Sequence, residues 1–316
     1  MLRSNLLYHR FMGVERCYVF DDGSTDETLD SVADLNFVIA RPAVSASEVP
    51  PIAGTAELLP RYDSHFAARQ LLNIAFTVPV AREAGFDWLV AIDADEFVIV
   101  DRRRALPDGL PQLLQAQPRA RETVTFRPLE VVQRRVSYDD VLADETLFKR
   151  TGTRARRATW DPFSQRQVRV PISYGHRAGK QAVRLDIDCT PYTSHRFTRP
   201  DGAPLRTAVV GELAHYYTHD ADAFIRKFRL MSDHPDRHAR GGAVDIQKRL
   251  WRDVVNRGGL SDSELKAYFE RWLMFNQAEV ERMSKRSRWP GLEPALVEVT
   301  SIRDALSQVR STTGGH

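Results

Sequence analysis

Cysteine and long apolar runs are both scarce in this chain of 316 residues. The two cysteines, Cys17 and Cys189, have no metal or redox spacing, so we expect free thiols in a reducing compartment. There is no sign of a signal peptide, and no apolar run is long enough to span a membrane. The sequence therefore predicts a cytoplasmic protein, which would meet a membrane only through a peripheral surface contact or a partner.

An excess of charge of one sign is also absent. Lysine and arginine total 45 and aspartate and glutamate total 42, so overall charge alone does not make the chain a polyanion binder. Hydrophobic residues make up 42% of the chain, which is enough for a substantial core. The length fits one large α/β domain, or one domain with an appendage.

The stretch from Trp88 to Val100 carries the strongest functional signal. A short apolar run ends at three acidic residues, Asp93, Asp95 and Glu96. Because unpaired buried charge is costly, we expect them at the end of a buried strand, facing a cleft and a counter-charge. In extended backbone Asp93 and Asp95 would project to the same side and could bind one cation, Mg²⁺ or Mn²⁺. The alternative is a strand that ends in an acidic turn without a ligand.

A second acidic turn is predicted near the start of the chain. Cys17–Phe20 has the pattern of a short strand, and Asp21 and Asp22 begin the turn that leaves it. Ser24 and the glutamate three residues later form the pattern of a capping box at a helix start. Ligands of open α/β sheets bind at the carboxyl ends of the strands. Asp21 and Asp22 are therefore candidates to accept hydrogen bonds from a base or a ribose, or they are common turn residues.

Together, the two motifs resemble the GT-A glycosyltransferases. The Asp-Asp-Gly-Ser-Thr-Asp turn, a Tyr-His-x-x-x-Gly-Val segment at residues 8–14 and the Asp-x-Asp-Glu-Phe motif are similar to a family-2-like branch. The resemblance extends from about Leu7 to Phe97 and returns more faintly between Gly179 and Lys227. It implies a GT-A-like (Rossmann-like) fold, a mixed α/β sheet flanked by helices. We expect this glycosyltransferase domain over residues 1–240.

The resemblance also implies an activity. A sugar would move from a nucleotide sugar, most simply a UDP-sugar, to a hydroxyl of a glycan or lipid-linked acceptor, with inversion, as in polysaccharide biosynthesis. Mn²⁺ or Mg²⁺ would be bound by Asp93 and Asp95, and Asp93 would also reach the donor. A histidine after a Lys-x-x-x-Arg strand could be a third ligand. His195 is that residue, and His215 is the alternative.

Two further residues are candidate donor contacts through the same resemblance. Gln70 lies on a helix predicted over residues 63–84, and Lys227 lies on a helix capped by Asp220. For both residues a solvated position on the helix surface is the alternative. The general base that would deprotonate the acceptor is not identified by any motif. Its candidates are Glu96, Glu130 and Asp161.

The start of the chain departs from the family pattern. Relatives carry a strand and an Asn-Glu pair before the Tyr-His helix, whereas this chain begins inside that helix. Loss of a central strand would leave backbone groups of its neighbours unpaired. Two interpretations stay open: a start that lies further upstream, or an N-terminally truncated, non-catalytic nucleotide-sugar-binding relative.

A basic stretch follows the acidic motif, from Lys149 to Arg169, with interleaved aromatic residues. It could bind a diphosphate or an anionic acceptor through arginine forks, or it could be a solvated basic loop. No nucleic-acid motif accompanies it, so no nucleic-acid partner is expected.

Helical spacing dominates the last part of the chain. Helices are predicted over Asp245–Val255 and Asp262–Ser284, separated by Gly258-Gly259, and disorder is predicted from about Ser311. We expect a C-terminal helical extension over residues 241–316, packed on the first domain. A haloacid-dehalogenase-type phosphatase is a remaining alternative for the Asp-x-Asp motif. That class has threonine soon after the second aspartate, where this chain has Glu96-Phe97.

Overall fold

The computed structural model describes residues 1–45, 47–48, 59–61, 66–151, 155–173, 175–232, 243–285 and 294–313. The chain is a mixed α/β protein with a helical C-terminal part, as the sequence predicted. Its contacts divide it into two compact units that alternate along the chain. Unit 1 comprises Met1–Arg127, Ala178–Leu213 and Asp304–His316, and unit 2 comprises Pro128–Arg177 and Ala214–Arg303.

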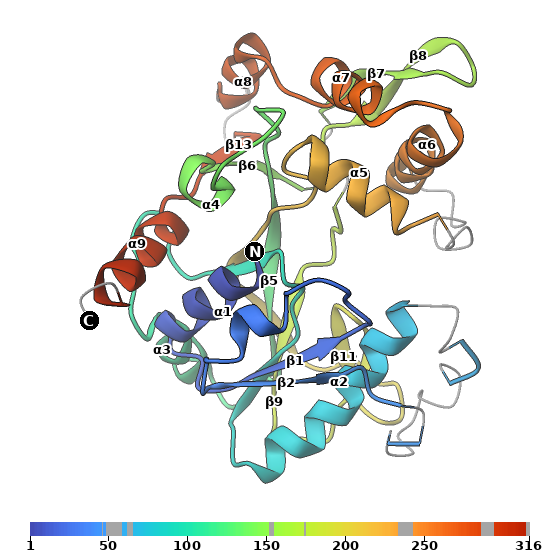
Figure 1. Ribbon diagram of the computed structural model, residues 1–316. Coiled ribbons are helices and arrows are strands. Elements are labelled where there is room, and N and C mark those ends of the chain that lie inside the picture. Colours follow the sequence, from blue (N-terminus) through green and yellow to red (C-terminus); the bar gives the residue numbers. More distant parts are fainter. Residues whose placement is uncertain are drawn as a thin grey trace. The chain divides into compact units, whose positions relative to one another are not determined.

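Unit 1 contains both acidic motifs. Its first two strands, β1 and β2, form a parallel pair beside helix α2, which is cyan in Figure 1. Its other main strands follow the order β3–β9–β5–β12–β4, with β9 antiparallel to both of its neighbours. The elements are α1 (Leu2–Phe11), β1 (Cys17–Asp21), η1 (Asp30–Val32), β2 (Val38–Pro42), η2 (Leu59–Arg61), α2 (Phe66–Glu83), β3 (Trp88–Val90), β4 (Glu96–Ile99), α3 (Gly109–Gln115), β9 (Lys180–Arg184), β10 (Thr190–Thr193) and β11 (Arg196–Thr198). Strands β5 (Thr123–Val131) and β12 (Thr207–His215) begin in this unit, and helix α9 (Ser301–Thr313) ends in it.

Helix α1 is attached to β4 by polar side chains. The Asn5 amide donates to the Glu96 carbonyl at 2.6 Å, and the Tyr8 hydroxyl donates to the Val98 carbonyl at 2.7 Å. The Val98 N–H donates to His9 Nε2 at 3.3 Å. These side chains satisfy backbone groups of β4 that would otherwise be buried without partners. Tyr8 and His9 therefore have a structural role, because they hydrogen-bond to β4, the strand that begins at Glu96 of the acidic motif.

The β1–β2 pair is a separate two-stranded sheet. Within the described residues β1 pairs only with β2, and β3 pairs only with β9. Residues of β1 and of β3 line one cavity of about 480 Å³. Residues of the two strands that precede the acidic turns thus line a common space.

Two local expectations were wrong. No α-helix begins at Ser24, because the Ser24 N–H donates to Asp21 Oδ1 at 3.0 Å and closes a turn instead. Asp93 and Asp95 do not lie on extended backbone, since the Glu96 N–H donates to the Asp93 carbonyl at 3.0 Å and closes a turn around them. The strand before this turn, β3, is half-buried, whereas β4 after it is fully buried.

Unit 2 contains the predicted C-terminal helices. Besides the ends of β5 and β12 it includes α4 (Val141–Asp144), β6 (Leu147–Arg150), β7 (Arg156–Asp161), β8 (Arg166–Pro171), α5 (Ala221–Arg229), α6 (Ala243–Arg257), α7 (Asp262–Trp272), α8 (Gln277–Ser284) and β13 (Leu296–Glu298). Strand β6 is antiparallel to β5 and β13, and β7 and β8 form an antiparallel hairpin. Asp220 caps α5 and Ser261 caps α7 in a capping box, as predicted.

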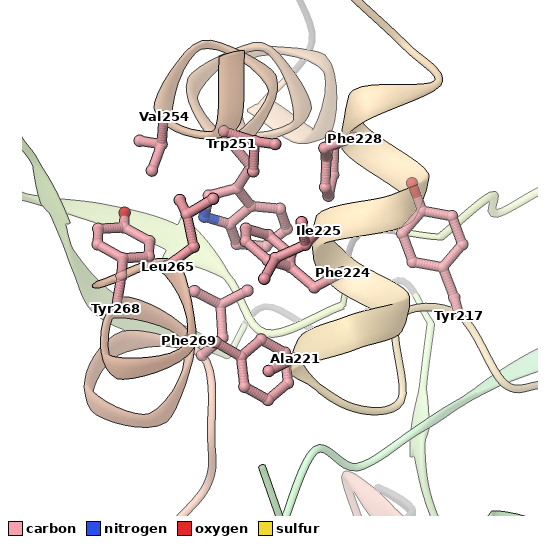
Figure 2. Packing of buried hydrophobic residues seen from close by; sticks show 12 residues of the cluster. Tyr217, Ala221, Phe224, Ile225, Phe228, Trp251, Val254, Leu265, Tyr268 and Phe269 are labelled. Carbon is pink, nitrogen blue, oxygen red and sulfur yellow. The ribbon is translucent and has the colours of Figure 1, made fainter. Parts of the chain in front are cut away.

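Aromatic packing joins three of these helices. Phe224 and Phe228 of α5 contact Trp251 of α6, and Phe269 of α7 lies 5.6 Å from Phe224 between ring centroids. Figure 2 shows these rings filling the space between the helices. The apolar stripe that follows Leu265 in the sequence is therefore core, in agreement with its helical spacing.

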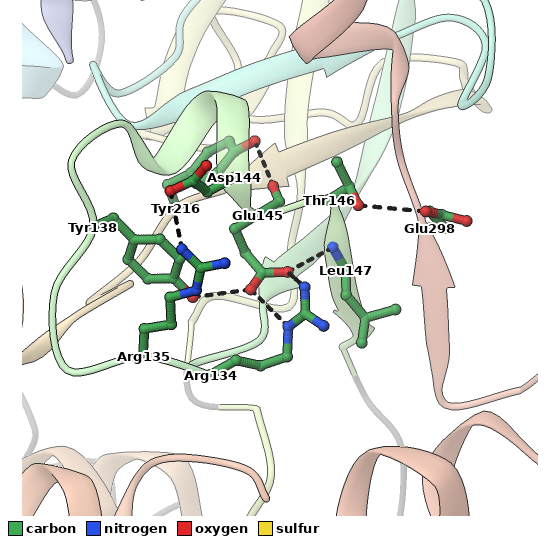
Figure 3. A network of polar contacts seen from close by, with 9 residues as sticks. All are labelled: Arg134, Arg135, Tyr138, Asp144, Glu145, Thr146, Leu147, Tyr216 and Glu298. Carbon is green, nitrogen blue, oxygen red and sulfur yellow. Dashed lines mark hydrogen bonds and ion pairs between the residues drawn. The ribbon is translucent and has the colours of Figure 1, made fainter. Parts of the chain in front are cut away.

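A buried carboxylate anchors α4 to β6. Glu145, at 1% side-chain exposure, accepts two hydrogen bonds from Arg134, one from Tyr138 and one from the Leu147 N–H (Figure 3). Thr146 beside it donates to Glu298 of β13. The arginine fork matches the two carboxylate oxygens, so the charge is fully compensated.

Two further sequence predictions were wrong, and a third lies partly outside the described residues. The single helix predicted over Asp262–Ser284 is two helices, because Asn276 caps α8 and ends the run. Residues Ser311–Thr313 belong to α9 and are not disordered. The start predicted for the helix over residues 63–84 lies outside the described residues, and its described part is α2.

Buried His9 should make the folding stability depend on pH. Burial lowers the pKa of His9 from its ordinary value of 6.5 to about 4. Both states are neutral above pH 6.5, so this contribution to stability is fully present there; as the pH falls toward 4 only the unfolded chain takes up the proton. We expect about 3 kcal/mol of stability to be lost across this window through His9.

Urea unfolding of the wild type and of His9→Gln between pH 4 and pH 7 measures this contribution. The variant should be less stable at pH 7 and should have a shallower loss of stability on acidification. Parallel pH profiles for the two proteins would contradict the assignment.

Candidate functional site

The Asp93–Glu96 turn presents two carboxylates and buries a third. Glu96 has no exposed surface, and its Oε2 accepts the Asp93 N–H at 2.8 Å. Asp93 and Asp95 are half-buried. The turn therefore uses Glu96 as its internal support and leaves the carboxylates of Asp93 and Asp95 at its surface.

Lys180 supplies the counter-charge that the acidic motif requires. Its ammonium group lies 3.3 Å from Asp93 Oδ1 and 3.4 Å from Glu96 Oε2, and it donates to the Ser194 carbonyl at 3.2 Å. Burial opposes the charged form of this lysine, but the charges of Glu96 and Asp93 outweigh it and raise its pKa. Lys180 is thus a buried cation at the first residue of β9, and Gly179 directly precedes it. A Cβ at Gly179 would lie 2.2 Å from the Phe126 carbonyl oxygen, so only glycine fits there.

Helix α2 links the two acidic turns through adjacent residues. Arg69 donates to both oxygens of Asp22, at 2.5 and 2.8 Å, and Gln70 donates to Asp93 Oδ1 at 2.5 Å. The structure therefore brings Asp22, Gln70 and Asp93 together, three of the residues that the sequence selected. The bidentate geometry with Arg69 fixes the orientation of the Asp22 carboxylate.

Asp21 is engaged within its own turn. Hydrogen bonds from the side chain and the backbone of Ser24 lower its pKa, so its carboxylate is ionised at neutral pH. Its backbone carbonyl accepts the Ala43 N–H at 2.7 Å after the end of β2. Asp21 therefore shapes the turn, and Asp22 is the residue that α2 holds.

The cavity of about 480 Å³ reaches this acidic motif from within unit 1. Its walls come from α1, β1, α2, β3 and α3. Most of the lining is apolar, and its polar residues include Gln70, Asn73, Asp87 and Asp93. A mostly apolar space with a few convergent polar groups has the size and composition of a small-molecule site.

His195 lies in the turn between β10 and β11. Its Nδ1 is 3.0 Å from the Gly179 carbonyl oxygen, which can only accept, so Nδ1 carries the proton in the neutral ring. The residue before it, Ser194, accepts the Lys180 ammonium that also contacts Asp93. Lys180 therefore contacts both the turn that carries His195 and the acidic motif.

The other sequence candidates belong to unit 2. His215, at the end of β12, is buried, and its ring lies 5.3 Å from that of His176 between centroids. Glu130 is buried and pairs with buried Lys149 at 2.7 Å. Burial lowers the pKa of Lys149, and the charge of Glu130 opposes this.

Lys227 and Asp161 also have local partners. The Lys227 ammonium lies 3.9 Å from the ring centroid of Tyr217, a cation–π contact. Asp161 accepts hydrogen bonds from the Phe163 and Ser164 N–H groups and from the Ser164 hydroxyl in the β7–β8 turn. These contacts place both residues without assigning them a role.

Sequence reasoning placed Lys149 in the basic stretch and Lys180 at the start of the Lys-x-x-x-Arg strand, but it did not assign the ion pairs of Arg69, Lys149 and Lys180. The signal for Lys180 was present, since a lysine that begins an apolar strand after glycine is a candidate for a buried cation. Arg69 carried no comparable signal, because arginines on helix surfaces are common.

The comparisons with known proteins give one informative relationship. No protein-family model matches the chain. A curated Arabidopsis thaliana protein named as glycosyltransferase-like is 22% identical over 204 residues, which are 61% of this chain. The match spans 45% of the relative's length, less than half of it. Among the described residues no helix is long and apolar enough to cross a membrane.

Removing Lys180 should destabilise unit 1. Lys180→Met leaves the Glu96 carboxylate buried without its cation, and we expect unfolding to become easier by about 3–5 kcal/mol. Adding Glu96→Gln to that variant removes the uncompensated charge and should recover most of the loss. Urea unfolding monitored by circular dichroism measures both effects. Equal stability of Lys180→Met and the wild type would contradict the buried ion pair.

Proposed function

We propose that this chain is a metal-dependent glycosyltransferase that uses a nucleotide-sugar donor. One observation carries the proposal: adjacent residues of α2, Arg69 and Gln70, bind Asp22 and Asp93 of the two acidic turns, and Gln70 and Asp93 line one cavity. A nucleotide sugar needs contacts to its nucleoside and to its diphosphate at the same time. The two turns provide a place for each within one unit. The relationship to a protein named as glycosyltransferase-like supports the same reaction class.

The charges at the acidic motif fit a divalent cation. Asp93, Asp95 and Glu96 place three carboxylates within four positions, and the Lys180 ammonium contacts those of Asp93 and Glu96. Carboxylate oxygens are the ligands that a hard divalent cation such as Mg²⁺ or Mn²⁺ prefers. Glu96 is committed to the turn and to Lys180. Asp95, with Asp93, is therefore the proposed carboxylate ligand.

His195 is the proposed third protein ligand. Its Nδ1 proton is directed to the Gly179 carbonyl, which leaves the Nε2 lone pair as the ligand atom. Fixing a histidine tautomer through a backbone carbonyl is the usual arrangement behind a metal-bound imidazole. His215 remains the alternative ligand.

The nucleoside would be recognised at the Asp22 side of the site. Asp22 is exposed and held by Arg69, so it can accept a hydrogen bond from a ribose hydroxyl or a base N–H. Gln70 and Asn73 offer amides at the adjacent wall of the cavity. A uridine diphosphate is the simplest probe for this arrangement. Lys227 stays a candidate for the donor phosphate.

The reaction leaves new negative charge on the departing nucleoside diphosphate. The cation, when bound, would stabilise that charge. The protein's own part is to hold Asp93 through Gln70 and Lys180 so that the donor is oriented. An inverting transfer also needs a base for the acceptor hydroxyl. Glu96, Glu130 and Asp161 remain the candidates, and each would have to give up local contacts to act.

A non-catalytic nucleotide-sugar-binding protein is the second candidate function. It is favoured by the strand pairing at the cavity, where among the described residues β1 pairs only with β2 and β3 only with β9, because two separate sheets orient a ligand less firmly than one continuous sheet. Such a protein would bind UDP and cation without hydrolysing or transferring the sugar. An assay that follows the release of UDP from UDP-glucose and related donors distinguishes the two functions. A glycosyltransferase would release UDP, and a non-catalytic binding protein would not.

Metal binding should depend on Asp95. Calorimetric titration of Mn²⁺ in the presence of UDP should give a signal in the wild type that Asp95→Ala loses, with an affinity at least tenfold weaker. Asp186→Ala, which removes an exposed aspartate after β9, is the matched control and should bind as the wild type does. Unchanged binding in Asp95→Ala would contradict the metal assignment.

The same titration tests the histidines. His195→Ala should weaken Mn²⁺ binding about tenfold, and His215→Ala should leave it unchanged, provided that both variants retain the wild-type circular dichroism spectrum. The reverse result would make His215 the ligand.

A nucleotide should protect both acidic turns from hydrogen exchange. With UDP and Mn²⁺ together, amide exchange should slow at residues 20–24 and at residues 91–96, because one ligand would contact both turns. Exchange measured by mass spectrometry with and without the ligands is the test, and Asp186→Ala is again the control. Protection confined to α5, α6, α7 and α8 would place the nucleotide elsewhere.

A further inference from the structure

The basic stretch after the acidic motif forms a hollow of its own in unit 2. This hollow, of about 670 Å³, lies between the β7–β8 hairpin and α8. Four arginines and one glutamate contribute all of its charged side chains. Its lining residues are Arg156, Arg157, Ala158, Gln167, Val168, Arg169, Glu279 and Arg282.

One of these arginines has a structural role. Arg157 donates to the carbonyls of Leu273 and Met274, at 2.6 and 2.8 Å, and lies 4.4 Å from the ring centroid of Phe275. Its guanidinium is also 3.7 Å from the Glu279 carboxylate. Arg157 and Glu279 therefore compensate each other, and the charge of the hollow comes from the other three arginines.

Those three arginines are exposed and concentrated. In the hairpin register Arg169 is opposite Ala158, two residues from Arg156, so the two arginines are diagonal neighbours on one face. Arg282 comes from the last turn of α8. Within the described part of the chain, Arg156, Arg169 and Arg282 form no ion pair with a carboxylate. Three like charges around one hollow repel one another unless an anion lies between them.

We propose that the hollow binds a small ligand with at least two phosphate charges, through Arg156, Arg169 and Arg282. Arginine forks suit phosphate oxygens, because each can donate two parallel hydrogen bonds. Ala158, which has a short side chain, also lines the hollow. The volume matches a small-molecule pocket. The proposal does not depend on the glycosyltransferase assignment, which concerns residues of unit 1.

Calorimetric titration with inorganic pyrophosphate at low ionic strength tests the site in the full chain. The wild type should bind, and Arg156→Ala combined with Arg169→Ala should bind at least tenfold more weakly. Arg166→Ala is the matched control, since it removes an exposed arginine of β8 that does not line the hollow. It should bind within about twofold of the wild type.

A variant outside the hairpin controls for the possibility that the double variant loses binding through a folding defect in the hairpin. Arg282→Glu on α8 should also weaken pyrophosphate binding at least tenfold while its thermal unfolding stays that of the wild type. Absence of binding by the wild type, or equal affinities of the Arg156/Arg169 double variant and Arg166→Ala, would overturn the proposal.

Phosphate groups could belong to a solute or to a lipid headgroup, and a second arm separates these sources. Sedimentation with phosphatidylcholine vesicles, with and without phosphatidylinositol 4,5-bisphosphate, is compared with pyrophosphate binding. Binding of pyrophosphate without vesicle sedimentation supports a solute. Sedimentation only with phosphatidylinositol 4,5-bisphosphate, lost in the double variant and kept in Arg166→Ala, supports a headgroup. Equal vesicle binding by the Arg156/Arg169 double variant and by Arg166→Ala would contradict the assignment of the binding site to the hollow.

Discussion

The burial of Glu96 beneath the acidic turn depends on the Lys180 ammonium. A carboxylate with no exposed surface is stable only beside a cation, and Lys180 provides one at 3.4 Å. Glu96 in turn accepts the Asp93 N–H, so the shape of the turn follows from the ion pair. The same ammonium contacts Asp93 and the Ser194 carbonyl. One buried charge therefore positions the carboxylate at the cavity and the turn that carries His195.

The second organising feature is the start of α2. Arg69 and Gln70 are adjacent in sequence and contact acidic residues 47 and 23 positions away, at Asp22 and Asp93. Neither acidic turn fixes the position of the other through the β-sheet, because β1–β2 and β3 belong to separate sheets in the described residues. The two turns are therefore linked by the contacts of α2 and not by a sheet that both of their strands share.

Arginine has two distinct uses in unit 2. Half-buried Arg157 donates to two carbonyls, and Arg134 donates to both oxygens of the buried Glu145 carboxylate, so both stabilise the fold. Arg156 and Arg169, on the other face of the same hairpin as Arg157, are exposed; Arg156 donates to the Arg169 carbonyl, and neither forms an ion pair with a described carboxylate. Strand alternation accounts for the difference, since successive side chains point to opposite faces. A basic run in the sequence thus contains both residues with structural partners and residues that are exposed.

The sequence by itself determined the local elements and the two acidic turns. Periodicity predicted the strands at residues 17–20 and 180–184 and the helix after Asp220, and turn chemistry predicted acidic residues at two strand ends. It also marked Gln70 and Asp22, which lie in contact with the site's organising residues. These features depend on neighbours within a few positions, and short-range patterns carry that information.

Only the tertiary structure decided how those pieces are paired. The sequence around Ser24 has the pattern of a helix cap, but in the folded chain the Ser24 N–H donates to Asp21 and closes a turn. The Asp93–Glu96 segment forms a turn because Glu96 is buried beside Lys180, 84 positions away. The partners Arg69–Asp22, Lys149–Glu130 and Lys180–Glu96 are long-range charge pairs. Their formation depends on which groups are buried together, and burial is a property of the packed chain that no local pattern encodes.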